Sequence, residues 1–223
     1  MPFKVQPTKL SDVPALASIY FAAFSTNLFG RVCFPDTPAV RRWWCDSIAH
    51  ELQHQPGAAF YNLVEYADGT ATPTFSASSA SARIVAFAKW LRPMQGTSPA
   101  STVQHPADLP ADCDAALFHA YFPELTKRHE ACMGTKPHWY LELLATHPAH
   151  QRRGAATRLI EHVLTANPDN AQYDAYLEAS PEGLSTYRRL GFERRDAFVV
   201  TIEGQEYETL MMVRPGKVMT GSK

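Results

Sequence analysis

The chain has 223 residues and a formal net charge of −1; 45% of the residues are hydrophobic and 19% are charged. This length and composition favour one globular domain with a sizeable core. The charge offers no field that would attract nucleic acid or an anionic membrane, and no apolar run is long enough to span a bilayer. The N-terminus lacks a signal peptide's apolar core, and the four cysteines form no C-x-x-C pair. We therefore expect a cytoplasmic protein, monomeric or homodimeric, without nucleic acid or membrane as partners.

The first elements are predicted from periodicity and from capping residues. Polar and apolar residues alternate over 3–6, which indicates a strand. Ser11 has the residue type of a helix N-cap and precedes apolar residues at helical spacing, whereas Phe29-Gly30 indicates a break in the chain. A second helix is predicted over 37–55, with Pro38 in its first turn.

The middle of the chain alternates between regular and irregular segments. Strands are expected over 58–66 and 82–91, with a hairpin turn at Asp68-Gly69. Residues 93–114 are rich in Pro, Ser, Thr and Ala, which is typical of an irregular insertion. A helix is predicted over 115–132, and its internal proline predicts a kink or a break.

Residues 139–164 form the most informative stretch. An apolar run over 139–146, interrupted only by Glu142, predicts a buried strand that ends at His147-Pro148. From Ala156 to Leu164, apolar residues recur at helical spacing. The connection between this strand and this helix is short, basic and built from small residues.

That connection has the features of an anion site. The first backbone N–H groups of a helix lack intrahelical partners, and the helix dipole adds partial positive charge at the same end. Gly154 and the two alanines after it leave these groups uncovered, and Arg152 and Arg153 add two cations. Such a helix start is suited to a pyrophosphate, although a solvated basic turn would have the same sequence.

The last third of the chain predicts three further strands and a short helix. A strand is expected over 173–179, and Pro181-Glu182 opens the helix. Gly191 stands where a helix C-terminus favours a left-handed residue. Two closing strands are expected over 198–202 and 207–213.

These elements predict an α/β fold with a mixed, mostly antiparallel sheet of six or seven strands and helices on both faces. We expect a single domain over 1–223, with the insertion at 93–114 and a frayed tail from 215.

Two stretches resemble the GNAT family of N-acetyltransferases. Gln151, Gly154 and Ala156 match the family's acetyl-CoA signature, Gln/Arg-x-x-Gly-x-Gly/Ala, position by position. Tyr187, followed by Leu190-Gly191-Phe192, is similar to the family's late motif, in which a helical Tyr precedes Leu-Gly-Phe.

The resemblance implies an acyl-CoA N-acyltransferase-like fold and an acetyl-CoA-dependent N-acetyltransferase. The acceptor would be a primary amine of a small molecule or peptide, which attacks the thioester directly. The strand ending at Thr146 would splay from the 173–179 strand, and acetyl-CoA would lie in the gap. The implied cofactor-binding residues are Leu144, Ala145 and Thr146 for the pantetheine, and Gln151, Arg152, Arg153, Gly154, Ala155 and Ala156 for the pyrophosphate.

Four side chains are candidates for further roles. A buried carboxylate such as Glu142 is costly unless it is paired or protonated, so Glu142 is either structural or a general base. Tyr140 lies on the same strand face and would contact the acceptor or the core. Tyr187 would protonate the departing thiolate, or serve as a core aromatic. Ser180 stands where the family often places an Asn that contacts the cofactor.

Two other functions remain open on the sequence. His50-Glu51-Leu52-Gln53-His54 has the H-E-x-x-H pattern of zinc proteases, but a third protein ligand does not follow nearby, and a partly exposed helix face explains the pattern as well. His147 and His150 are interpreted as loop residues. A non-catalytic acyl-CoA-binding module would keep the loop and lack a working base.

Overall fold

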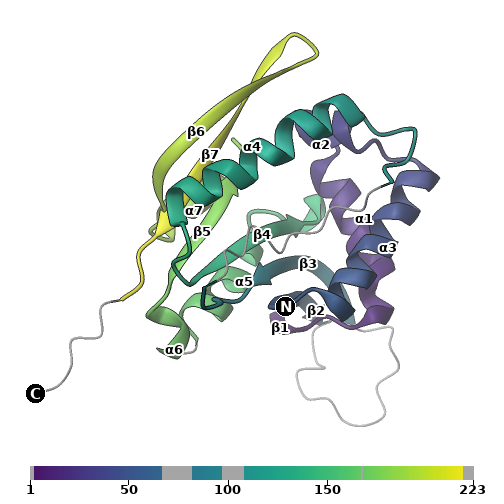
Figure 1. The fold of residues 1–223 in the computed structure, drawn as a ribbon. Helices are drawn as coiled ribbons and strands as arrows, with labels where there is room; N and C mark the ends of the chain where they lie inside the picture. The colour runs from purple at the N-terminus through teal and green to yellow at the C-terminus, as the bar shows by residue number, and fades with distance from the viewer. Residues whose placement is uncertain (1–2, 67–81, 97–107, 167, 218–223) are drawn as a thin grey trace, which may run out of the picture.

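The computed structural model describes residues 3–66, 82–96, 108–166 and 168–217 (Figure 1). Within these residues, the chain forms seven strands together with α-helices and short 3-10 helices. The elements are β1 (Phe3–Pro7), the 3-10 helix η1 (Leu10–Asp12), α1 (Val13–Phe24), α2 (Leu28–Cys33), α3 (Pro38–His54), β2 (Ala58–Tyr66), β3 (Ala82–Leu91), α4 (Ala115–Met133), β4 (His138–Thr146), the 3-10 helix η4 (Pro148–His150), α5 (Ala155–Leu164), α6 (Pro168–Ala171), β5 (Asp174–Ala179), α7 (Leu184–Arg189), β6 (Glu193–Ile202) and β7 (Gln205–Arg214).

The strands form one mixed sheet in the order β1-β2-β3-β4-β5-β7-β6. Every neighbouring pair is antiparallel except β4 and β5, which run parallel. The predicted fold class, a mostly antiparallel mixed sheet with helices on both faces, is confirmed.

The parallel pair opens halfway along its length. β4 and β5 pair only from His138–Asp174 to Leu141–Leu177, although β4 continues to Thr146. Beyond Leu141, β4 remains paired with β3 on its other side. The splay that the resemblance implied is therefore present, and the β5-facing edge of β4 is left for another partner.

Helices cover both faces of the sheet. α5 packs on one face against β1 to β4, and its buried residues, such as Leu159 and Ile160, join the main core. α1 and α3 pack on the other face. Figure 1 shows α4 running from α2 to the β6–β7 pair, and α4 contacts α2, β6 and β7. The second face is therefore enclosed by α1, α3 and α4.

Local differences from the predictions have local causes. The N-cap of α1 is Asp12, not Ser11, because a turn of 3-10 helix precedes α1. The break predicted at Phe29-Gly30 is wrong: the Asn27 side chain accepts a hydrogen bond from the Gly30 N–H at 2.8 Å and starts α2 there.

Other boundaries shift only slightly. α4 continues through Pro123, so of the two predicted alternatives, a kink or a break, the break is wrong. The two closing strands are longer than predicted and turn around Gly204, whose φ is +76°. The start of the predicted tail, which begins at residue 215, is held by a hydrogen bond from the Lys217 N–H to the Ala171 carbonyl. The turn predicted at Asp68-Gly69 lies outside the described residues.

None of the described helices is both long enough and apolar enough to cross a membrane.

Candidate active site

A cleft of about 680 Å³ lies where β4 and β5 separate. Its walls come from the end of β4, the loop before α5, the first turn of α5, and α7. The residues predicted to bind the cofactor line it, with one exception. They are Leu144, Ala145, Thr146, Gln151, Arg152, Gly154, Ala155, Ala156 and Ser180.

Gly154 opens the cleft to a ligand. It is the N-cap of α5 with a φ of +80°, a left-handed conformation that costs glycine little. No atom lies within 4 Å of the position that a Cβ would occupy there. The loop before it is shaped by Arg152, which also has a positive φ, of 59°. The start of α5 is therefore accessible, as an anion site requires.

The two loop arginines point in different directions. Arg152 is exposed and lines the cleft. The guanidinium of Arg153 instead donates to Glu65 Oε1 at 2.7 Å and lies over the Phe3 ring. The Arg153 side chain is therefore held by a largely buried carboxylate on β2 and does not line the cleft, so a contact between Arg153 and the pyrophosphate stays a prediction. Arg189 of α7, which was not predicted, supplies a second cation to the cleft.

Tyr187 stands between this cleft and a second cavity. A Cβ on Gly183 would lie 2.6 Å from the Tyr187 ring, so only glycine permits this approach of the two residues. Burial raises the pKa of Tyr187 above its ordinary range. The phenol is therefore protonated at neutral pH and able to donate a hydrogen bond.

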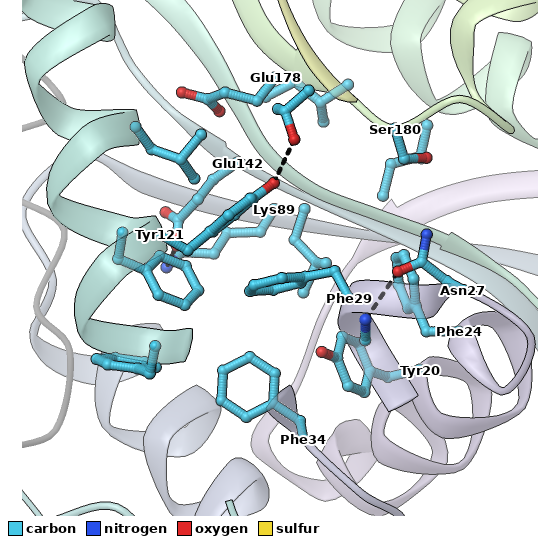
Figure 2. Close-up of a pocket in the computed structure, with 18 of the residues that line it drawn as sticks. Tyr20, Phe24, Asn27, Phe29, Phe34, Lys89, Tyr121, Glu142, Glu178 and Ser180 are labelled. Carbon is cyan, nitrogen blue, oxygen red and sulfur yellow. Dashed lines mark hydrogen bonds and ion pairs between the residues drawn. The ribbon is translucent and has the colours of Figure 1, made fainter. Parts of the chain in front are cut away.

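The second cavity, about 270 Å³, lies beneath α1, α3 and α4 on the other side of Tyr187. It shares Phe24, Asn27, Leu144, Ser180 and Tyr187 with the first cleft. The two spaces are therefore neighbours with a common wall. Figure 2 shows the acidic side chains Glu142 and Glu178 at one end of this cavity and the aromatic ring of Phe34 at the other.

Glu142 lies at a β-bulge. Lys89 of β3 pairs with Leu143 and Trp90 pairs with Leu141, so Glu142 has no opposite residue. Its Oε1 accepts a hydrogen bond from Lys89 Nζ at 2.6 Å. Its Oε2 is buried without a hydrogen-bond partner among the described residues. One carboxylate oxygen is thus committed to Lys89, and the other is free.

Lys89 bridges two carboxylates. Its side chain is only 1% exposed, and Nζ lies 2.9 Å from Glu51 Oε2 in addition to the contact with Glu142. Burial raises the pKa of Glu51, although the Lys89 ammonium opposes that shift. Glu51 therefore faces the cavity as the partner of Lys89.

This placement removes support for the zinc alternative. Glu51, the acid of H-E-x-x-H, is turned inward to Lys89, while the rings of His50 and His54 lie beside each other, tilted by 48° with their centroids 4.8 Å apart. Within the described ranges, no group of three or more His, Cys, Asp or Glu side chains could hold a metal ion.

A third carboxyl group, Glu178 of β5, also lines the cavity. Burial raises its pKa to about 8, while hydrogen bonding from Tyr140 opposes the shift. Its Oε1 lies 4.0 Å from Nδ1 of His129, whose Nε2 is 2.6 Å from Nε2 of His138. Burial lowers the pKa of His129 to about 2, so this imidazole is neutral.

Sequence reasoning missed two of the charged groups that line the cavity, Lys89 and Glu178, and considered Glu51 only as part of the H-E-x-x-H pattern. A signal was present for the two that were missed. Lys89 and Glu178 each interrupt an apolar strand, as Glu142 does. Glu51 gave no such signal, because charged residues are frequent on helices.

Comparison with protein families finds a match for part of the chain. Residues 127–201, which run from the end of α4 into β6, match the acetyltransferase (GNAT) domain. The matched region contains Glu142, Gly154, Ser180 and Tyr187. A comparison with curated protein sequences finds no significant match.

Solved structures share the fold across the whole chain. A Corynebacterium glutamicum protein described as histone acetyltransferase HPA2 and related acetyltransferase is 19% identical, with a TM-score of 0.59, 99% of this chain covered and 100% of the other. Arabidopsis thaliana NAA60, in complex with a bisubstrate analogue, is 13% identical, with a TM-score of 0.55 and coverage of 95% and 97%.

The ribosomal-protein-S18-alanine N-acetyltransferase of Escherichia coli is 14% identical, with a TM-score of 0.55 and coverage of 100% and 98%. At these identities the likeness shows the fold. The resemblance noted in the sequence is confirmed by the family match and by this shared fold.

Proposed function

We propose that this chain, which has the GNAT fold, is an N-acetyltransferase that transfers an acetyl group from acetyl-CoA to a primary amine of a small molecule or peptide. The observation that carries the proposal is the common wall of the two spaces. An accessible helix start and an unpaired strand edge line the first. A free carboxylate oxygen lies at the second. Donor and acceptor would therefore meet beside Tyr187.

The cofactor cleft suits acetyl-CoA by the chemistry of its walls. Gly154 and the first turn of α5 would hold the pyrophosphate, with Arg152 and Arg189 as counter-charges. The free edge of Leu144 to Thr146 would hydrogen-bond the pantetheine as an added strand. When bound, acetyl-CoA supplies the activated acyl group as a thioester.

Glu142 would act as the general base. An alkyl ammonium has an ordinary pKa near 10, so an amine acceptor is mostly protonated at neutral pH and cannot attack. The free Oε2 of Glu142 would accept that proton, while Lys89 and the bulge hold the carboxylate in the cavity.

Tyr187 would act at the other side of the reacting carbonyl. Its phenol is held by close packing on Gly183 and lines both spaces. It would donate its proton toward sulfur as the thiolate departs. No cysteine is required as a nucleophile, because the amine attacks directly.

Two measurements test the proposal. Calorimetric titration with acetyl-CoA should give a Kd in the micromolar range, which corresponds to a binding free energy of roughly −8 kcal/mol. A screen of primary amines and peptides, read by release of the CoA thiol, should find acceptor-dependent turnover. Binding without turnover for any amine would leave a CoA-binding module and refute the enzyme.

A further inference from the structure

The wall of the acceptor cavity is rich in aromatic side chains. Twelve of the twenty-eight described residues that line it carry an aromatic ring of Phe, Tyr or Trp. Phe29 is central among them: its ring stacks on Tyr121 at 3.9 Å and lies 6.1 Å from the ring of Tyr207. Such walls bind compact apolar or aromatic bodies, which fill the space and meet ring faces.

The charges in this cavity favour a cation. Three carboxyl groups line it, and Lys89 is the only Lys or Arg among the described lining residues. The ammonium of Lys89 is already occupied by Glu51 and Glu142. The one lining histidine, His129, is neutral because burial lowers its pKa to about 2. The unpartnered Oε2 of Glu142 accepts hydrogen bonds and donates none.

Among the residues that the structure describes, no other Lys or Arg replaces Lys89 in the lining of the cavity. Arg128 lies on α4 but binds Glu124 and Asp196 instead of lining the cavity. Of the segments outside the described ranges, 67–81 and 97–107 contain no Lys or Arg in their sequence, and 218–223 contains Lys223. An acid group on the acceptor would therefore enter the cavity beside the Glu142 carboxylate, with no free Lys or Arg among the described lining residues to pair with, which is unfavourable.

We propose that the acceptor is a small amine on a compact aromatic body that carries no acid group, and that free amino acids are excluded. This assignment deepens the acetyl transfer proposed above and holds only if that transfer takes place in this cavity. Phe29 is its principal specificity-determining residue. The ammonium end would face Glu142, and the ring would lie among the aromatic side chains.

Four acceptors separate the parts of the proposal. The probes are 2-phenylethylamine, L-phenylalaninol, L-phenylalanine and n-propylamine, and the readout is kcat/KM from CoA thiol release. Phenylalaninol carries a neutral group where phenylalanine carries its carboxylate, so it controls for bulk. We expect phenylalanine to be acetylated at least about 100-fold less efficiently than phenylalaninol. We expect phenylethylamine to exceed propylamine by about 10-fold or more.

Different outcomes contradict different claims. Phenylalanine within tenfold of phenylalaninol would overturn the exclusion of acids, and equal rates for propylamine and phenylethylamine would overturn the aromatic acceptor. Turnover of peptides but of none of the four probes would overturn the proposed acceptor while the acetyltransferase stands. Failure of every amine, with acetyl-CoA still bound, would refute the enzyme and the acceptor together.

A variant tests the role of Phe29. Phe29→Leu keeps an apolar side chain but loses the ring, and it should lower the ratio of kcat/KM for phenylethylamine over propylamine by about 5-fold or more. Tyr61→Leu, on β2 beside His162 of α5, serves as a control and should leave the ratio unchanged. Thermal melting confirms that each variant is folded. An unchanged ratio in folded Phe29→Leu would remove Phe29 from acceptor selection.

Discussion

Replacement of Lys89 by Met is the most direct test of the charge arrangement in the acceptor cavity. The ammonium is 1% exposed and lies within 2.9 Å of two carboxylates. Met has a similar length and fills the same space without a charge. The variant therefore leaves Glu51 and Glu142 buried beside each other without a counter-ion.

The expected cost follows from that burial. Removing one partner of a buried ion pair destabilises a protein by about 3–5 kcal/mol. For a domain of this size, 1 kcal/mol corresponds to about 2–4 °C, so Tm should fall by roughly 6–20 °C. Lys89 also lowers the pKa of Glu51, so its loss should raise that pKa further. A raised folded-state pKa favours the protonated form, and stability is then lost as pH rises through it. The decrease in Tm caused by Lys89→Met should accordingly be smaller at pH 5 than at pH 8.

The assay is thermal unfolding of wild type and Lys89→Met at both pH values. Lys136→Met is the matched control, because Lys136 contacts Asp174 at 2.6 Å but its side chain is 62% exposed. An exposed pair of this kind contributes at most about 1 kcal/mol. The reasoning would be refuted if Lys89→Met lowered Tm no more than the control does. It would also be refuted if the decrease in Tm did not change with pH.

Substitutions at four further positions test the proposed site. Gly154→Asp should weaken acetyl-CoA binding at least about 10-fold more than Gly154→Asn in calorimetry, because both residues tolerate a left-handed backbone and only Asp brings a negative charge to the phosphate site; equal affinities would reject that site. Glu142→Gln should retain acetyl-CoA binding and lose about 10²–10⁴-fold in kcat/KM near neutral pH, and the loss should shrink toward pH 10 as the amine deprotonates unaided; profiles that stay parallel would assign Glu142 to positioning. Tyr187→Phe should lower kcat about 100-fold with the Kd for acetyl-CoA unchanged, and normal turnover would make Tyr187 a packing residue. The pKa of Glu178 is raised from 4.5 to about 8, so its stabilising contribution is present below pH 4.5 and lost as pH rises through 8; Glu178→Gln should match the wild-type Tm near pH 5 and exceed it at pH 9, and coincident melting curves at pH 9 would contradict this.

The strands and the longer helices could be predicted because their apolar residues carry a clear period. α3 also had a strong start signal: Thr37 accepts a hydrogen bond from the Val40 N–H, and Pro38 follows it. α2 was missed because its cap, Asn27, is a residue type that also favours turns, and Gly30 reinforced that interpretation.

The site was predicted in part, for a similar reason. A lone charge in an apolar strand drew attention to Glu142, and the same rule identifies Lys89 and Glu178. Their mutual contacts depend on which strands are neighbours, and on α3 placing Glu51 over β3, which no local pattern encodes. The direction of Arg153 was likewise undetermined, because its long side chain reaches Glu65 as readily as the cleft.

The bulge in β4 explains how the sheet accommodates the Glu142 side chain. Between Tyr140 and Thr146, seven residues of β4 face only six of β3, from Ala86 to Leu91. Leu141 and Leu144 pack into one core, and Leu143 and Ala145 pack into the other. The alternation of side chains between the two faces of the sheet is therefore interrupted at Glu142 and resumes after it. Glu142 is in effect an insertion into a strand whose two apolar faces are complete without it. The carboxylate is therefore an addition to the sheet that presents it, and we expect a chain without Glu142 to pair β3 with β4 in unbroken register at this point.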